Sequence, residues 1–307
     1  MAGSKPSLIP LAFVTPCLAV MLLIGAYPIL SSIYLSVTNL SASNPEPEFV
    51  GLENYASALR DPNFWNSARI TIFYAGATVS AELLVGLILT LLLFGEVRGK
   101  KFFESYISLP LAIPPIVVGV LFSPNVILDD LNTLLYYGMC IAPFCSGNTG
   151  FFLDVNQPQV YYTMMIASDA FIWAPLFMLV MLAILGGVPK ELFEVADVNG
   201  ASAFHKFRYI TLPSLVSSPA LGVMIALRVI DSFRSFEIPY AWNFWLGHER
   251  VGTPVDTFSV LMFKMFSYSS FEFPLAQTAA IALMLFAVSL TSAWVILRLF
   301  TKGSGVE

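Results

Sequence analysis

The sequence predicts an all-α integral membrane protein. Of its 307 residues, 57% are hydrophobic and 11% are charged, whereas charged residues make up about a quarter of ordinary soluble domains. Several apolar runs are long enough to cross a hydrocarbon core of ~30 Å as helices. They lack the short alternating pattern of an outer-membrane β-barrel. We therefore expect one transmembrane domain over residues 1–307, built as a bundle of six helices.

Six apolar runs have the length of membrane spans, and they lie near 8–36, 69–95, 104–123, 161–187, 212–236 and 275–300. The first run has no small-residue cleavage site, so we interpret it as a span rather than a signal peptide. The third run contains Pro110, Pro114 and Pro115. Because proline lacks an amide donor, this run is either simply kinked or broken in the manner of helices that line transport pathways.

The distribution of basic residues predicts that both termini lie in the cytoplasm of a multi-pass cell-membrane protein. With that orientation the lysines and arginines on the cytoplasmic side are Lys5, Arg98, Lys100, Lys101, Lys190, Lys206, Arg208, Arg298 and Lys302. The opposite side has only Arg60, Arg250 and Lys264, with Arg69 at an edge. The outer loops are then 39–67, 124–160 and 237–274, and residues 188–211 form a cytoplasmic loop.

The motif content excludes several classes of function. The chain has no G-x-x-x-x-G-K-[ST] phosphate loop and no H-E-x-x-H helix. It also has no basic groove with interleaved aromatic residues, so we expect no nucleic-acid binding. Ser80 near Glu82 and Ser168 beside Asp169 could suggest a nucleophile, but a serine in a membrane helix usually donates to a backbone carbonyl. We expect no catalytic residue, metal or cofactor in this chain.

Charged residues at membrane depth are costly, at least ~2.5 kcal/mol each, unless they face a partner or water. The spans contain Glu82, Asp169, Arg228 and Asp231, with Arg234 and Glu237 at the outer end of the fifth span. The spacing of three between Arg228, Asp231 and Arg234 places them on one helix face. This face is either a self-neutralising ladder of charges or the lining of a polar passage.

Two cysteines, Cys140 and Cys145, lie close together in the outer loop 124–160. A local disulfide and free thiols are both compatible with this position, because oxidation is permitted outside the cytoplasm. Metal binding is the poorer interpretation, since two thiols need further ligands and neither histidine falls in that loop.

The polar segment 188–211 has the pattern of two short helices joined at a glycine. Pro189 is suited to an early helical position, and Glu191 and Glu194 complement the positive end of a helix. An apolar stripe follows at Leu192, Val195 and Ala196, and Gly200 can adopt the positive φ of a helix end. A second short helix carries Phe204 and Phe207. The alternative, an amphipathic helix lying on the membrane, is disfavoured by the acidic first half.

The pattern Glu194-x-Ala196-x3-Gly200, continuing to Ile210-x-Leu212-Pro213, resembles the "EAA" signature of the membrane subunits of binding-protein-dependent ABC importers. Val195 replaces the usual first alanine, and Asn199 stands where an aspartate is frequent. The segments Phe49–Tyr55 and Asp61–Trp65 resemble the first outer segment of sugar-uptake permeases of the maltose and glycerol-phosphate type.

This resemblance implies a permease subunit of an ATP-driven importer, with the fold of the type I importers. The segment 188–211 would be a coupling helix that docks on a separate ATPase, which binds the ATP and magnesium. The implied coupling residues are Glu191, Glu194, Val195, Ala196, Asn199, Gly200, Ala201, Leu212 and Pro213. The implied partners are two ATPase subunits, an extracytoplasmic solute-binding protein and a second permease. The second permease is either a related chain, giving a heterodimer, which the resemblance favours, or a second copy of this chain.

The resemblance further suggests that the solute is a mono- or oligosaccharide, or a molecule like glycerol phosphate. Trp173, Trp242 and Trp245 could stack on sugar faces, or they could serve packing and interfacial anchoring. The candidate pathway residues are Asp169, Trp173, Arg228, Asp231, Arg234 and Glu237. The alternatives are an ion-coupled secondary transporter that uses Asp169, Asp231 or Glu82, and a membrane scaffold or enzyme.

Overall fold

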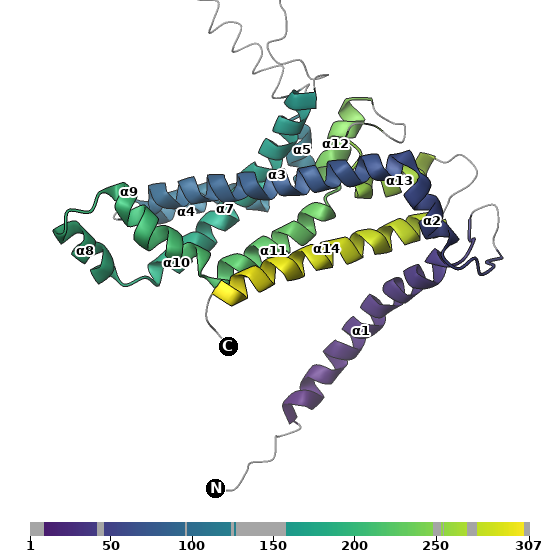
Figure 1. Ribbon diagram of the computed structural model, residues 1–307, viewed down its shortest axis with the longest axis horizontal. Helices are drawn as coiled ribbons and strands as arrows, with labels where there is room; N and C mark the ends of the chain where they lie inside the picture. Colours follow the sequence, from purple (N-terminus) through teal and green to yellow (C-terminus); the bar gives the residue numbers. More distant parts are fainter. Residues whose placement is uncertain are drawn as a thin grey trace, which may run out of the picture. The chain divides into compact units, whose positions relative to one another are not determined.

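The computed structural model describes residues 9–41, 46–95, 97–123, 126, 158–247, 253, 255–268 and 275–303. The regular elements of this part are helices (Figure 1), apart from an isolated bridge between Thr38 and Phe49. The chain divides into two compact units. The first comprises Met1–Pro62 with Met265–Met284, and the second comprises Asn63–Lys264 with Leu285–Glu307.

Four helices are long and apolar enough to cross a membrane unbroken. They are α1 (Ile9–Ser36), α3 (Pro62–Leu93), α7 (Pro158–Gly186) and α14 (Leu275–Gly303). These helices coincide with the first, second, fourth and sixth predicted spans. α3 begins earlier than the expected residue 69, because Phe64 and Ser67 already belong to its buried face.

The third and fifth predicted spans are both bent. In the third, α4 (Lys100–Ile107) and the 3₁₀ turn η1 (Leu109–Ala112) meet α5 (Pro115–Leu121) at 94°. The break falls where Ile113 and Pro114 are extended, since a residue before proline avoids the helical conformation. If each bent pair counts as one span the total is six, and that number stays a prediction.

The fifth predicted span breaks in the same way between α10 (Leu212–Val216) and α11 (Pro219–Phe233), at a bend of 65°. Ser218 is extended at ψ 119° and precedes Pro219, so the same restriction on the residue before proline applies. The break leaves α11 as a separate helix that carries Arg228 and Asp231.

In the first unit, the segment that follows α1 folds back to close the end of that helix. The side chain of Asn54, in α2 (Glu53–Arg60), donates to the carbonyls of Ser36 at 2.8 Å and Thr38 at 2.7 Å. The hydroxyl of Tyr55 donates to Ser36 Oγ at 2.9 Å. The last carbonyls of a helix have no partner within it, so Asn54 supplies a donor to the Ser36 carbonyl, while Tyr55 holds the Ser36 side chain.

In the second unit, small residues allow helices to approach closely. A side chain at Gly86 of α3 would place its Cβ 2.6 Å from Phe177 Cβ of α7, and one at Gly119 of α5 would place it 3.0 Å from Ala241 Cβ. Such close contact through glycine is typical of packing between membrane helices. It holds α3 against α7, and α5 against α12 (Glu237–Trp245).

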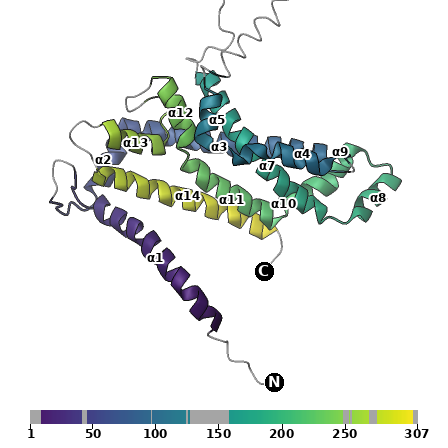
Figure 2. The ribbon, with the colours of Figure 1, turned by 180° about the vertical axis from the view of Figure 1, so that it is seen from behind.

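The segment expected to be the outer loop 237–274 contains two helices, α12 and α13 (Phe258–Tyr268). Both views of the ribbon show them at the end of the second unit opposite α8 (Lys190–Val198) (Figures 1 and 2). Trp242 is fully buried in a core cluster with Tyr74 and Val118. Its ring therefore serves packing and is not free to stack on a sugar.

Candidate functional site

The six candidate pathway residues surround one cavity in the second unit. This polar pocket has a volume of about 130 Å³ and is lined by Pro115, Asp169, Trp173, Arg228, Asp231, Arg234, Ser235, Glu237 and Ile238. The residues come from α5, α7, α11, α12 and the link between the last two. Residues up to 123 positions apart in the chain, Pro115 and Ile238, thus meet at the break of the third predicted span.

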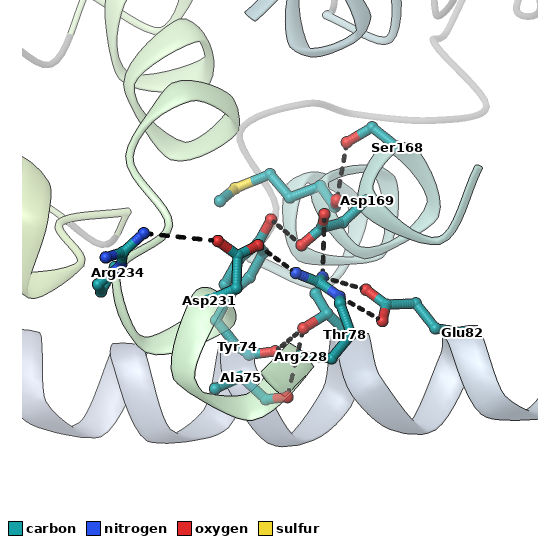
Figure 3. A network of polar contacts seen from close by, with 10 residues as sticks. Tyr74, Ala75, Thr78, Glu82, Ser168, Asp169, Arg228, Asp231 and Arg234 are labelled. Atoms are coloured by element: carbon teal, nitrogen blue, oxygen red, sulfur yellow. Dashed lines mark hydrogen bonds and ion pairs between the residues drawn. The ribbon is translucent and has the colours of Figure 1, made fainter. Parts of the chain in front are cut away.

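Arg228 is the centre of the charged network behind this pocket (Figure 3). Its guanidinium donates to both carboxylate oxygens of Glu82 on α3, at 2.9 Å for the Nε–Oε2 contact. It also contacts Asp231 Oδ2 at 2.5 Å and Asp169 Oδ1 at 3.5 Å. Glu82 is fully buried and Arg228 is 3% exposed, so the ion pair compensates charges that would otherwise be costly in the membrane.

Two aromatic residues complete the network. The hydroxyl of Tyr74 donates to Asp169 Oδ2 at 3.1 Å, and Trp173 lies with its ring centre 4.4 Å from the Arg228 Cζ. A guanidinium over an indole face is attracted by the ring quadrupole, and more strongly when water is excluded. Asp169 and Trp173 lie one helical turn apart on α7 and hold Arg228 from the same side.

The outer rim of the polar pocket is more exposed. The side chain of Arg234 is 67% exposed and lies 3.9 Å from Asp231 Oδ1, whose side chain is 47% exposed. Glu237 is exposed at the start of α12. The structure therefore contains both alternatives for this face: the charges at positions 228, 231 and 234 pair along the helix, and they also line the pocket.

Sequence reasoning identified the charges at membrane depth but not their pairing. It placed Glu82 and Arg228 in the same set of charges without predicting that they form an ion pair, and it did not select Tyr74. The spacing of residues within α11 predicts the contact from Arg228 to Asp231, whereas the contact to Glu82 joins residues 146 positions apart. The interpretation of the serines is confirmed, because Ser80 Oγ donates to the Gly76 carbonyl and Ser168 Oγ to the Met165 carbonyl.

The predicted polar segment 188–211 forms a protrusion, which we call the coupling segment. It begins with α8 after Gly187, and Pro189 is the residue before the helix rather than within its first turn. Pro189 has an extended backbone with a ψ of 130°, because the first residue with helical backbone angles is Lys190. Gly200 ends the helix with φ +73°, and the amide of Ala201 donates to the Ala196 carbonyl at 2.9 Å. A glycine in this conformation closes a helix without side-chain strain.

A second helical run follows the glycine. α9 (Ala203–Lys206) is capped by Ser202, whose hydroxyl accepts from the His205 amide, and it continues through the π-helical turn η3 (Phe207–Thr211) into α10. Lys206 Nζ lies 2.7 Å from Asp197 Oδ1 and joins the two arms of the coupling segment. Leu212 and Pro213 begin α10, so they lie on the second arm, whereas Glu191, Glu194, Val195 and Ala196 lie on the first.

The coupling segment exposes apolar side chains. Leu192, Val195 and Val198 are 51%, 60% and 89% exposed on α8, and Phe204 is 69% exposed on α9. Phe193 does not belong to this exposed group, because its ring centre lies 5.5 Å from that of Phe94 at the end of α3. In both ribbon views α8 and α9 lie at one end of the second unit, beyond the adjacent end of α3 (Figures 1 and 2). An exposed apolar face flanked by Glu191 and Glu194 is typical of a protein-binding surface.

Two predictions concern sites elsewhere in the chain. Cys140 and Cys145 lie outside the described residues. Within the part of the chain that the structure describes, no group of three or more His, Cys, Asp or Glu side chains could hold a metal ion.

The fold and these two sites define a multi-pass helical membrane protein with a polar cavity and a protruding loop. The model of the family "Binding-protein-dependent transport system inner membrane component" matches residues 82–302. The chain belongs to this family of ABC transporter permeases. The match covers the polar pocket and the coupling segment, and it does not favour an ion-coupled transporter.

Relatives match over most of the chain. A probable ABC transporter permease protein, y4oQ of Sinorhizobium fredii, is 30% identical over 96% of this chain and 91% of its own length. The trehalose/maltose transport system permease protein MalF of Thermococcus litoralis is 29% identical over 74% of each chain. A crystal structure of a bacterial alginate ABC transporter, in complex with an alginate pentasaccharide-bound periplasmic protein, contains a chain of the same fold. That chain has a TM-score of 0.70 and 16% identity, covering 97% of this chain and 95% of its own.

Proposed function

We propose that this permease forms half of the membrane pathway of an ATP-driven carbohydrate importer. The coupling segment carries the proposal, because it presents Leu192, Val195 and Val198 to the surroundings on a short helix fixed at Gly200. A transport subunit without a phosphate loop needs another polypeptide to hydrolyse ATP. We assign that role to a partner ATPase that binds this exposed face. The ATPase, and not this chain, would bind the ATP and magnesium.

The polar pocket is the proposed part of the translocation pathway, and a carbohydrate is the proposed solute. The named trehalose/maltose relative supports this class of solute. Hydroxyl groups of a sugar can donate to carboxylates such as Asp231 and Glu237 and accept from Arg234. The extracytoplasmic delivery of the solute by a binding protein belongs to the same proposal.

The size of the polar pocket favours completion by a second permease. Its volume of about 130 Å³ is below the range of roughly 300–1,000 Å³ of small-molecule sites. We propose that a related permease supplies the opposite wall and that two ATPases bind the two coupling segments. In this arrangement residues 1–307 act as one transmembrane domain with both termini in the cytoplasm.

Affinity purification in a mild detergent tests the proposed coupling. Leu192→Asp introduces a charge on the exposed face of α8, and Leu52→Asp is the matched control, since Leu52 is 71% exposed outside the coupling segment. We expect the wild-type protein and Leu52→Asp to retain an ATPase subunit, and Leu192→Asp to lose it by about tenfold or more, because burial of a charge at an interface is costly. Equal retention by Leu192→Asp, or ATP-independent uptake by the isolated permease, would overturn the proposal.

A further inference from the structure

We infer that the polar pocket admits uncharged carbohydrates and rejects anionic ones such as sugar phosphates and uronates. This inference rests on the proposed function, since it concerns the solute of the same pathway. Its basis is the net charge of the residues that line the pocket, together with the carboxylates that lie next to the two arginines that could bind an anion.

The first arginine is already occupied. Arg228 contacts the carboxylates of Glu82, Asp169 and Asp231, and its planar face lies against Trp173. These carboxylates accept four hydrogen bonds from the five N–H groups of the guanidinium, so an anionic solute could form a two-point contact with it only by displacing one of them. Displacing Glu82 would leave a fully buried carboxylate without its partner, and an unpaired buried charge costs several kcal/mol.

The second arginine is the only remaining cation among the described residues that line the pocket. Arg234 is exposed, and its guanidinium lies 3.9 Å from the Asp231 carboxylate. Arg234 shares the pocket lining with two carboxylates, Asp231 and Glu237. Sites that recognise phosphate or carboxylate groups usually present several convergent donors or paired arginines.

The sum of charges is negative. The lining contains three carboxylates, Asp169, Asp231 and Glu237, and two guanidinium groups, a formal net charge of −1. Glu82, which lies behind Arg228, makes the cluster more negative. A negative field in a cleft with low-dielectric walls lowers the local concentration of anions. An uncharged sugar meets no such barrier and finds acceptors for its hydroxyl groups.

Charged thiol reagents measure this field whichever solute the importer carries. Ser235 lines the polar pocket and is half-buried, and Ser235→Cys exchanges one small side chain for another. The assembled importer carrying this cysteine, with Cys17→Ser to remove an exposed thiol, is treated with 2-sulfonatoethyl and 2-trimethylammonioethyl methanethiosulfonate. The rate of each reagent is divided by its rate with a free thiol, and labelling of the same protein with Ser235 retained is subtracted.

We expect the cationic reagent to react faster than the anionic one by about tenfold, within the range that focused fields produce. In the double variant Asp231→Asn with Glu237→Gln, the cationic reagent should no longer react faster than the anionic one. The matched control, Glu53→Gln, removes a carboxylate outside the pocket that is 3.8 Å from Arg60 and should leave the ratio unchanged.

Each other outcome would overturn the inference. Equal rates, or a faster anionic reagent, would show that the pocket does not repel anions. Failure of both reagents to react would show that Ser235 does not face an aqueous pathway. Retention of the ATPase is measured separately on Leu192→Asp, so a failure of the charge inference is distinguishable from a failure of the proposed function.

Discussion

The guanidinium of Arg228 on α11 and the carboxylate of Glu82 on α3 form a two-point ion pair in which Arg228 is 3% exposed and Glu82 is fully buried. The same guanidinium reaches Asp169 on α7. One side chain therefore joins three helices of the second unit at the wall of the polar pocket. Because the pair is buried between α3 and α11, its loss would affect both the stability of the bundle and the shape of the pocket.

Replacement of this arginine should destabilise the protein strongly. We expect Arg228→Met to lower the free energy of unfolding by about 3–5 kcal/mol, because Glu82 would remain buried without a partner. Arg234→Met is the matched control, and since Arg234 is 67% exposed it should cost about 0–1 kcal/mol. Unfolding of the detergent-solubilised protein by a denaturing detergent measures both. Equal losses for the two variants would show that the buried pair has no special role.

Removing both members of the pair should be less harmful than removing one. In Glu82→Gln with Arg228→Met, the carboxylate that Arg228→Met leaves unpaired is also neutralised. We expect the double variant to recover at least about 1 kcal/mol relative to Arg228→Met alone, as coupled residues do in double-mutant cycles. Strictly additive losses would contradict direct coupling between the two side chains.

The backbone of the coupling segment depends on Gly200. Gly200→Val places a β-branched residue at φ +73°, where L-residues pay about 1–2 kcal/mol. We expect the variant to insert normally but to hydrolyse ATP without matching uptake. The control is Gly186→Val, since Gly186 has open space around it and no positive φ. Normal uptake by Gly200→Val would argue against a fixed turn at this position.

The end of α1 depends on Asn54. Asn54→Ala removes the donors to the carbonyls of Ser36 and Thr38, and we expect a loss of about 1–3 kcal/mol for polar groups left without partners. Ser31→Ala is the control, because its exposed hydroxyl only donates to Pro28 within the same helix. Thermal unfolding distinguishes them, and an unchanged midpoint for Asn54→Ala would exclude the capping role.

A second buried ion pair fixes the segment between α12 and α13. Lys264 is 2% exposed, and its Nζ lies 2.7 Å from Asp256 Oδ1 and 2.8 Å from Asn243 Oδ1. We expect Lys264→Met to cost about 3–5 kcal/mol, since Asp256 would remain buried. Lys190→Met, at an exposed lysine, should be nearly neutral in the same thermal assay. A small loss for Lys264→Met would mean that Asp256 gains solvent or another partner.

Much of this fold follows from local pattern. Apolar length predicts α1, α3, α7 and α14. Gly200 adopts the expected positive φ because an end of a short helix needs a residue without a side chain. These features depend on a few neighbouring residues, so the sequence contains them directly.

The remaining features depend on residues far apart in the chain. Nothing near Arg228 indicates that Glu82 accepts two of its hydrogen bonds, and nothing near Trp242 indicates that its ring is buried against α3 and α5. The break before Pro219 could have been predicted, since Ser218 precedes a proline. The helices α12 and α13 were missed because the segment 237–274 was treated as a connection between spans, although its Trp242 packs in a core cluster with Tyr74 and Val118.

The most direct test of the central claim is cross-linking from the coupling segment. Val195→Cys, at a position 60% exposed on α8, is treated in membranes that contain the whole importer with a reagent that joins its thiol to a lysine amine of a neighbouring subunit. We expect a covalent product with the ATPase subunit, and none from a cysteine placed at the exposed Leu52. A product absent from Val195→Cys, or a Val195→Cys thiol labelled from the extracytoplasmic side, would contradict the account.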